Sequence, residues 1–307
     1  MTGGDGFIGS HLADRLQDRG LDFALLDLKF GKNSAGLTCE KIRADVRDYQ
    51  KISRLVRNRD AVVHLAAVSR VEWGQMDPVR CLQVNTIGTL NLIEAIRKKN
   101  PDALVVSASS REVYGEPSRF PVRETDSKHP ISVYGSSKLA AENLVRSYGR
   151  TYGMKHVILR FSNVYGSPRD LPQRVIPNFM NRAVKNKPLE VYGGNQVLDF
   201  TFIDDVADGI ISTLSKALAD NTKVLNDDFN FTSNRGTSVL RLASLIGKVC
   251  GSESRIVKKN ARSFDVSKFI GDFTKARSRA GYQPSHSLED GLKIYRDRLQ
   301  GARNEAE

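Results

Sequence analysis

The chain has 307 residues, 40% of them hydrophobic, which is enough to bury a substantial core in one large or two small domains. Its apolar runs are broken by Asp, Lys or Arg, so we expect neither a span of about 20 apolar residues that could cross a membrane nor a signal peptide. The formal net charge of +12 is dispersed in small basic groups without interleaved aromatic residues, which favours a solvated surface or an anionic small-molecule substrate over nucleic acid.

The first element in the chain is a glycine-rich loop, "MTGGDGFIGS", followed by a helical pattern that begins near Phe7. Gly3, Gly6 and Gly9 let the backbone turn tightly and approach a pyrophosphate, whose charge meets free N–H groups and the positive end of the helix. Asp27 closes the next strand 18 residues after Gly9, where an acid binds a ribose 2′-hydroxyl and repels a 2′-phosphate. The pattern predicts a dinucleotide site that prefers NAD to NADP.

Short apolar runs typical of strands alternate with longer helical patterns as far as about residue 205. Parallel strands need crossover connections, so the alternation predicts an α/β fold with a Rossmann-type, doubly wound parallel sheet. The strand-like runs are 22–27, 61–67, 103–109 and 156–162, and the clearest helical patterns are 10–20 and 77–99.

After residue 163 the pattern loosens into turn-rich segments, and a strand-like piece at 228–232 is followed by mainly helical sequence. We therefore predict a smaller, partly interleaved C-terminal α/β domain. The first predicted domain covers 1–163, with 198–232 partly returning to it, and the second covers 164–197 and 233–307.

A candidate catalytic group combines a helix and a strand end. The helical pattern that starts at Ser132 places Tyr134 and Lys138 four residues apart, on one face. An unperturbed phenol is a poor base at neutral pH, but a nearby ammonium favours the phenolate and lowers the pKa of the phenol. Ser110 follows the strand-like run 103–109, at the edge where α/β sheets bind ligands.

The cysteines Cys39, Cys81 and Cys250 lie far apart and fit neither a disulfide framework nor a CxxC metal site. We therefore expect reduced thiols, no bound metal and a cytoplasmic protein.

Six motifs extend from Thr2 to about Pro284: "TGGDGFIGSHL", "HLAA" at 64–67, "VNTIGTLNLIEA" at 84–95, "SVYGSSK" at 132–138, "RFSNVYG" at 160–166 and "GDFTKARSRAGYQP" at 271–284. Together they resemble the extended short-chain dehydrogenase/reductase family, specifically the nucleotide-sugar epimerases and dehydratases typified by UDP-glucose 4-epimerase. The resemblance implies that the first domain binds NAD and the second binds the sugar nucleotide.

The resemblance also implies a mechanism. Tyr134 removes the proton from a sugar 4-hydroxyl, Ser110 acts as hydrogen-bond relay, and the C4 hydride passes to NAD. Lys138 holds the nicotinamide ribose as well. In an epimerase the 4-keto sugar then turns over and takes the hydride back on its other face, which regenerates NAD in each cycle.

Further positions carry over from the same resemblance. In substrate binding, Asn163 meets the diphosphate side and Arg262 clamps the diphosphate. The cofactor contacts include the glycine-loop residues Phe7 and Ile8, the adenine-side pair Asp45 and Val46, the strand-end residues Leu65, Ala66 and Ala67, and Asn85, which steadies the neighbouring loop.

Position 198 departs from the commonest family pattern, because many relatives carry a phosphate-binding arginine where this chain has Leu198. Bidentate arginine–phosphate contacts are strong, so the lost charge matters. We expect Arg262, together with Arg174, to supply it.

The stretch after Ser110 departs as well. Sugar 4,6-dehydratases use Thr-Asp-Glu there, in which the Asp is the acid and the Glu the base; this chain keeps the base as Glu112 but has Arg111 in place of the acid. Dehydration therefore lacks a proton donor, although Ser110 and Glu112 also fit relatives that decarboxylate UDP-glucuronate. Arg111 either meets a sugar carboxylate or faces solvent.

The start of the chain is the third departure. A glycine loop of this family follows a buried central strand, and only Met1 and Thr2 precede the glycines here. Unpaired buried backbone groups cost about 1–3 kcal/mol each. We expect the sequence to be short at its start, with closure of the gap by neighbouring strands as the alternative.

The leading prediction is an NAD-dependent 4-epimerase of UDP-glucose and UDP-galactose or of UDP-glucuronate. A 4,6-dehydratase or UDP-glucuronate decarboxylase that uses Glu112 is the second enzyme hypothesis, and a protein that binds NAD or a sugar nucleotide without turnover is the third. Relatives commonly pair through two long helices, here about 77–99 and 132–152, so we also expect a homodimer.

Overall fold

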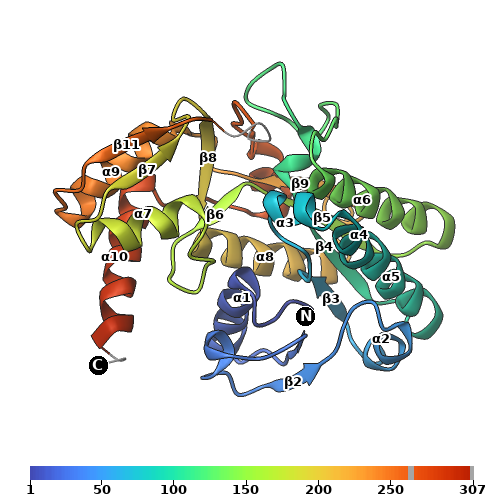
Figure 1. Ribbon diagram of the computed structural model, residues 1–307. Helices are drawn as coiled ribbons and strands as arrows, with labels where there is room; N and C mark the ends of the chain where they lie inside the picture. The colour runs from blue at the N-terminus through green and yellow to red at the C-terminus, as the bar shows by residue number, and fades with distance from the viewer. Residues whose placement is uncertain (262–265, 305–307) are drawn as a thin grey trace.

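The computed structural model describes residues 1–261 and 266–304. A parallel sheet lies at its centre, with helices on both faces (Figure 1). The predicted α/β class and doubly wound parallel sheet are confirmed. The strands are, in spatial order, β2 (Glu40–Arg43), β1 (Ala24–Asp27), β3 (Ala61–His64), β4 (Leu104–Ser110), β5 (His156–Phe161) and β9 (Asp227–Phe231).

Thr2 lies between β1 and β3 and connects the two. It forms parallel bridges to Leu26 and His64, its N–H donates to the Val63 carbonyl at 2.9 Å, and its carbonyl accepts from the Leu65 N–H at 3.2 Å. The sheet is therefore continuous across this position. The expectation that the sequence is short at its start stays a prediction.

Successive strand residues point into two different cores. In β4, Leu104 and Val106 pack in a core with α1 and α8, whereas Val105 packs in a core with α2, α5 and α6. This alternation follows from the two-residue period of a strand that is buried on both faces. The helices on the two faces are α1 (Phe7–Asp18), α8 (Ile203–Leu218), α2 (Tyr49–Leu55), α5 (Gly88–Lys99) and α6 (Val133–Tyr152).

The predicted helix at 77–99 is divided by a π-helical turn. Its parts are α4 (Pro78–Leu82), the turn η2 (Gln83–Ile87) and α5. A short helix, α3 (Val71–Met76), precedes it. The described residues contain no helix that is long and apolar enough to cross a membrane.

The termini of α6 are fixed by local sequence. The Ser132 hydroxyl accepts a hydrogen bond from the Gly135 N–H at 3.0 Å, which caps the start of the helix. Gly153 ends it with a φ of +70°, in the left-handed region that favours glycine. Tyr134 and Lys138 therefore lie in the first turns of a helix whose start is determined by its cap.

A second, smaller group of elements packs around its own core, which includes Phe179, Leu242 and Tyr295 (Figure 1, left). The segment 198–232 contributes to both groups, since β8 pairs with β6 and β9 pairs with β5. The domain boundaries themselves stay a prediction. The elements of this group are β6 (Asn163–Tyr165), α7 (Val175–Ala183), β7 (Leu189–Tyr192), β8 (Val197–Phe202), β10 (Gly236–Ser238), α9 (Val239–Cys250), β11 (Ile256–Lys259) and α10 (Leu288–Asn304).

Three short turns complete the described elements. They are η1 (Lys32–Ser34), η3 (Arg111–Tyr114) and η4 (Ala276–Ala280).

Candidate active site

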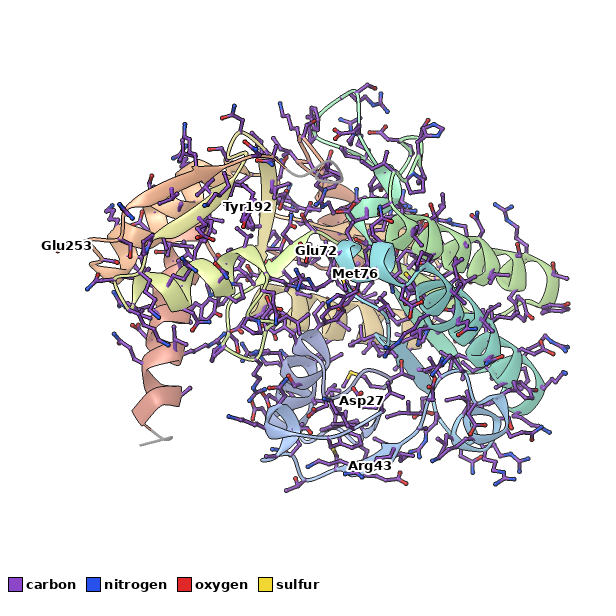
Figure 2. All side chains as sticks on the ribbon, in the orientation of Figure 1. Asp27, Arg43, Glu72, Met76, Tyr192 and Glu253 are labelled. Atoms are coloured by element: carbon purple, nitrogen blue, oxygen red, sulfur yellow. The ribbon has the colours of Figure 1, made fainter. Side chains whose placement is uncertain are left out.

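A cavity of about 810 Å³ lies at the carboxyl ends of the parallel strands. Ligands bind at this edge in open α/β sheets. Glu72 of α3 and Tyr192 of β7 lie near it from different parts of the fold (Figure 2). Most of the site residues expected from the sequence line it: Gly3, Gly6, Phe7, Ile8, Gly9, Asp27, Asp45, Val46, Leu65, Ala66, Ala67, Ser110, Arg111, Glu112, Tyr134, Lys138, Asn163 and Arg174.

Asn85, also expected at the site, does not line the cavity. Asn85 lies behind the lining, where its side chain accepts from the Val68 N–H at 2.7 Å and donates to the Val68 carbonyl at 3.1 Å. It therefore holds the loop that follows β3, as expected. Arg262 lies outside the described residues, so its role stays a prediction.

Glycine is required at two positions of the loop before α1. Gly3 has a φ of +69°, and a Cβ there would lie 2.7 Å from the Ala66 nitrogen. A Cβ on Gly9 would lie 2.1 Å from the Gly3 carbonyl oxygen. The loop and the start of α1 are thereby packed closely together. Among the described residues no side chain caps the start of α1, so its N–H groups are available to an anion.

Asp27 has part of its hydrogen-bonding capacity occupied by backbone. Its Oδ2 accepts from the Asp5 N–H at 3.0 Å and its Oδ1 from the Leu28 N–H at 2.7 Å. Burial raises the pKa of this carboxyl, and the backbone hydrogen bonds oppose the shift. Each carboxylate oxygen accepts more than one hydrogen bond, so the group can still bind ribose hydroxyls.

Asp45, the other acid at this end of the cavity, is paired with Arg47. The Arg47 Nη2 lies 2.6 Å from Asp45 Oδ2, and this side-chain hydrogen bond lowers the pKa of Asp45.

The candidate catalytic side chains are buried in the wall of the same cavity. Tyr134 is 9% exposed and Lys138 is 6% exposed. The Lys138 Nζ donates to the Ala108 carbonyl at 3.0 Å. Burial lowers the pKa of Lys138 to about 8.

The phenol pKa differs from the sequence expectation. Burial raises the pKa of Tyr134, opposed by a hydrogen bond from Ser110 and by the charge of Arg174. The lowering contributions come from Ser110 and Arg174, where the sequence predicts Lys138, and the cost of burying a phenolate outweighs them. Tyr134 and Lys138 line one cavity, but the pKa of Tyr134 is raised, whereas the sequence analysis expects it to be lowered.

Arg111 and Glu112 form an ion pair in the cavity wall, with Arg111 Nη2 at 2.7 Å from Glu112 Oε1. The Arg111 guanidinium lies 5.7 Å from the centre of the Phe269 ring. Its Nη1 is buried without a hydrogen-bond partner among the described residues. Arg111 is therefore buried in the site and does not face solvent.

Arg174 is held by two groups near the cavity. Its Nη2 donates to the Ser69 carbonyl at 3.2 Å, and its Nε lies 3.6 Å from Asp170 Oδ1. Asp170 lines the cavity and its Oδ2 is buried without a described hydrogen-bond partner. Burial raises the pKa of Asp170 to about 6.

Sequence reasoning missed Asp170 and Arg70, which both line the cavity. Arg70 forms an ion pair with Glu72 and stacks 5.5 Å from the centre of the Trp73 ring. Leu198 also lines the cavity, so position 198 contributes an apolar surface. The signal for Arg70 was its place directly after the loop of a parallel strand, because such loops line ligand sites.

These features can be compared with known proteins. The NAD dependent epimerase/dehydratase family model matches residues 1–230, and the chain belongs to this family. It is therefore an NAD-dependent enzyme. A putative UDP-glucose 4-epimerase from Methanocaldococcus jannaschii is 35% identical over 299 residues, which cover 95% of each chain.

Solved structures of nucleotide-sugar 4-epimerases have the same fold as this chain. A UDP-glucose 4-epimerase from Thermotoga maritima, solved with UDP-glucose, has a TM-score of 0.91 and 32% identity over 98% of both chains. A UDP-glucuronic acid 4-epimerase from Bacillus cereus, in complex with UDP-glucuronic acid and NAD, has a TM-score of 0.88 and 29% identity over 98% of both chains.

The residues of this chain fit NAD. The uncapped start of α1 and the close-packed glycine loop suit a pyrophosphate, and Asp27 lies in the same cavity for a ribose.

Proposed function

We propose that the protein is an NAD-dependent nucleotide-sugar 4-epimerase that acts on a UDP-sugar, either UDP-glucose and UDP-galactose or UDP-glucuronate. One observation carries the proposal: Ser110, Tyr134 and Lys138 line the same cavity as the glycine loop. The ligands of the Thermotoga and Bacillus structures support the choice of substrates.

Bound NAD would supply reversible hydride transfer at the sugar C4. The chain itself supplies the proton chemistry: Tyr134 accepts the proton of the 4-hydroxyl, and Ser110, whose side chain lowers the pKa of the phenol, relays it. Lys138 is tied to the Ala108 carbonyl and lies where it can hold the nicotinamide ribose. All three side chains are largely shielded from bulk solvent by the protein around them.

The diphosphate side is assigned to Asn163, Arg174 and Arg262, and the smaller group of elements to substrate binding. The Asn163 Nδ2 donates to the Asp199 carbonyl at 2.9 Å, which leaves its Oδ1 for the substrate. Many relatives bind phosphate with an arginine at position 198, where this chain has Leu198. In this proposal Arg174, which lines the same cavity, binds the phosphate instead.

A second candidate is a UDP-glucuronate decarboxylase or a 4,6-dehydratase, because Glu112 lines the cavity. Arg111 opposes dehydration, since it stands where a dehydratase needs an acid and occupies Glu112 Oε1. The same arginine suits a sugar carboxylate.

The test is to incubate the purified protein with a panel of UDP-, GDP- and dTDP-sugars and to determine product masses and sugar configuration. We expect a UDP-sugar converted to its 4-epimer with unchanged mass. Loss of water or carbon dioxide would support the second candidate instead, and absence of turnover across the panel would contradict both.

We also propose a homodimer formed through the helices at 77–99 and 132–152. Val79 is 65% exposed, Leu82 and Ile87, which follow it in α4 and η2, are exposed as well, and Met76, at the end of α3, is 83% exposed. Large exposed apolar patches mark interfaces. We expect a dimeric mass by light scattering at micromolar concentration and a monomeric mass for Val79→Glu; a monomeric unmodified protein would contradict the proposal.

A cytoplasmic location stays a prediction.

A further inference from the structure

Asp5 lies between the glycines of the loop before α1, and its side chain contacts the segment that follows β1. Its Oδ2 accepts from the Gly31 N–H at 3.0 Å and its Oδ1 from the Ser34 hydroxyl at 2.6 Å. The Asp5 carbonyl accepts from Asn33 Nδ2, also at 3.0 Å. The segment 28–35 is therefore fastened to the glycine loop by both the side chain and the backbone of one residue.

The same residue contacts the acid expected to bind the ribose. The Asp5 N–H donates to Asp27 Oδ2 at 3.0 Å, and the negative charge of Asp5 contributes to the raised pKa of Asp27. Asp27 and Leu28 line the cavity, whereas Asp5 lies behind Asp27. Asp5 thus both orients the Asp27 carboxylate and adds a second negative charge beside it.

A second charge matters because the adjacent strand carries a cation at the position in register with Asp27. Arg43 of β2 is in register with Asp27 of β1, and Figure 2 shows the two side chains on these adjacent strands. A single carboxylate next to an arginine gives little net charge with which to repel a phosphate. The carboxylates of Asp5 and Asp27 together outnumber the Arg43 guanidinium, which leaves a net negative charge at this position to repel a 2′-phosphate.

From these contacts we propose that Asp5 is a positioning and specificity-determining residue for the coenzyme. It holds segment 28–35 and Asp27 in place for a ribose 2′-hydroxyl and discriminates against coenzymes with a 2′-phosphate. The inference rests on the proposed coenzyme site, and it deepens that site by assigning part of the NAD preference to a residue outside the cavity lining.

The experiment measures dissociation constants of NAD and NADP by calorimetry for coenzyme-free protein and four variants. Asp5→Asn removes the charge at nearly constant shape, and Asp5→Ala also removes the side-chain hydrogen bonds to Gly31 and Ser34, while the backbone hydrogen bonds to Asp27 and Asn33 remain. Ser34→Ala removes one fastening bond and keeps the charge. Asp22→Asn is the matched control, because it removes an exposed carboxylate from the same α1–β1 region.

For Asp5→Asn we expect the preference for NAD over NADP to fall by about fivefold, the size typical of a partly exposed charge interaction. Asp5→Ala should lower the preference at least as much and should weaken NAD binding further. Ser34→Ala should weaken both coenzymes to a similar degree and leave the preference unchanged, and Asp22→Asn should leave both constants unchanged.

An unchanged preference in Asp5→Asn and Asp5→Ala, with NAD bound by the unmodified protein, would overturn this inference and leave the proposed function intact. Failure of the unmodified protein to bind NAD would overturn the proposed function instead. Thermal melting of each variant separates loss of binding from loss of folding.

Discussion

Tyr134, Lys138 and Asp170 have proton affinities that are set mainly by burial. The pKa of Tyr134 is raised, that of Lys138 is lowered to about 8, and that of Asp170 is raised to about 6. Perturbed groups that converge on one cavity are typical of functional sites. The neighbours Ser110 and Arg174 act in the opposite direction on the phenol, so they are the residues of the chain that favour its ionised form.

Tyr134→Phe removes the proposed proton acceptor and keeps the ring. We expect turnover to fall by about 10²–10⁴-fold, the usual contribution of a positioned acid or base. NAD affinity should stay close to that of the unmodified protein, which calorimetry would check. Tyr152→Phe, at the exposed end of the same helix, is the control and should turn over normally. Full activity of Tyr134→Phe would exclude the proposed mechanism.

The pH dependence of substrate binding tests Asp170. Above about pH 6 its carboxylate is charged and holds Arg174, and below that pH the interaction weakens. We therefore expect the KM for the sugar nucleotide to rise as the pH falls from about 7 to 5. Asp170→Asn should flatten this profile, and an unchanged profile in that variant would assign the effect to another group.

The same shift has a defined effect on folding. Because the pKa of Asp170 is higher in the folded chain than its ordinary value of 3.8, protonation favours the folded state. This stabilising contribution to the free energy of unfolding is fully present below pH 3.8 and is lost as the pH rises through about 6.

At the scale of elements, a buried ion pair joins α6 to the sheet. Glu142 of α6 accepts from Arg160 of β5 through two hydrogen bonds, each of 2.8 Å, and from the Ser109 hydroxyl of β4 at 2.6 Å. Ser109 precedes Ser110, and Glu142 follows Lys138 by one turn. The pair therefore fixes the helix that carries Tyr134 against the strand that carries Ser110.

Glu142→Gln leaves the Arg160 charge buried with one fewer anionic partner. Breaking a buried pair costs about 3–5 kcal/mol, so we expect the free energy of unfolding to fall by that amount in urea denaturation. The control is Glu94→Gln on α5, whose partners Arg97 and Lys98 lie nearer the surface. There we expect a loss below about 1 kcal/mol. Equal losses in the two variants would contradict the structural role of Glu142.

The sequence predicts those parts of the site that depend on local pattern. The glycine loop, the pair Tyr134 and Lys138, and the serine that ends β4 follow from spacing alone, since a strand end or a helix face places each of them. Asp170 was missed because it lies in a turn-rich segment without periodicity, and because its burial depends on how distant segments pack around it. The direction of the Tyr134 pKa shift was also missed, because burial is a property of the assembled fold.

At the scale of the whole molecule, the cavity is lined by both groups of elements. Gly3 and Asp27 come from the central sheet region, and Arg174 and Tyr192 come from the smaller group. A ligand that fills the cavity contacts both, so binding should stabilise the whole chain.

Addition of NAD at about 100 times its dissociation constant should stabilise the folded state by about 2.7 kcal/mol. For a chain of this length we expect Tm to rise by about 4 °C, measured by differential scanning calorimetry. Gly9→Ala should abolish the rise, because its Cβ would lie 2.1 Å from the Gly3 carbonyl oxygen. A rise of the same size in that variant would place NAD elsewhere.

The pairing of β5 with β9 connects residues 156–161 to residues 227–231, with much of the smaller group between them. During synthesis on the ribosome, the β5 edge has no partner until β9 has emerged. Exposed edges of this kind recruit other chains and promote aggregation. The nascent protein therefore depends on completing its later segments before its central sheet is protected, and a fragment ending at residue 163 would retain that open edge.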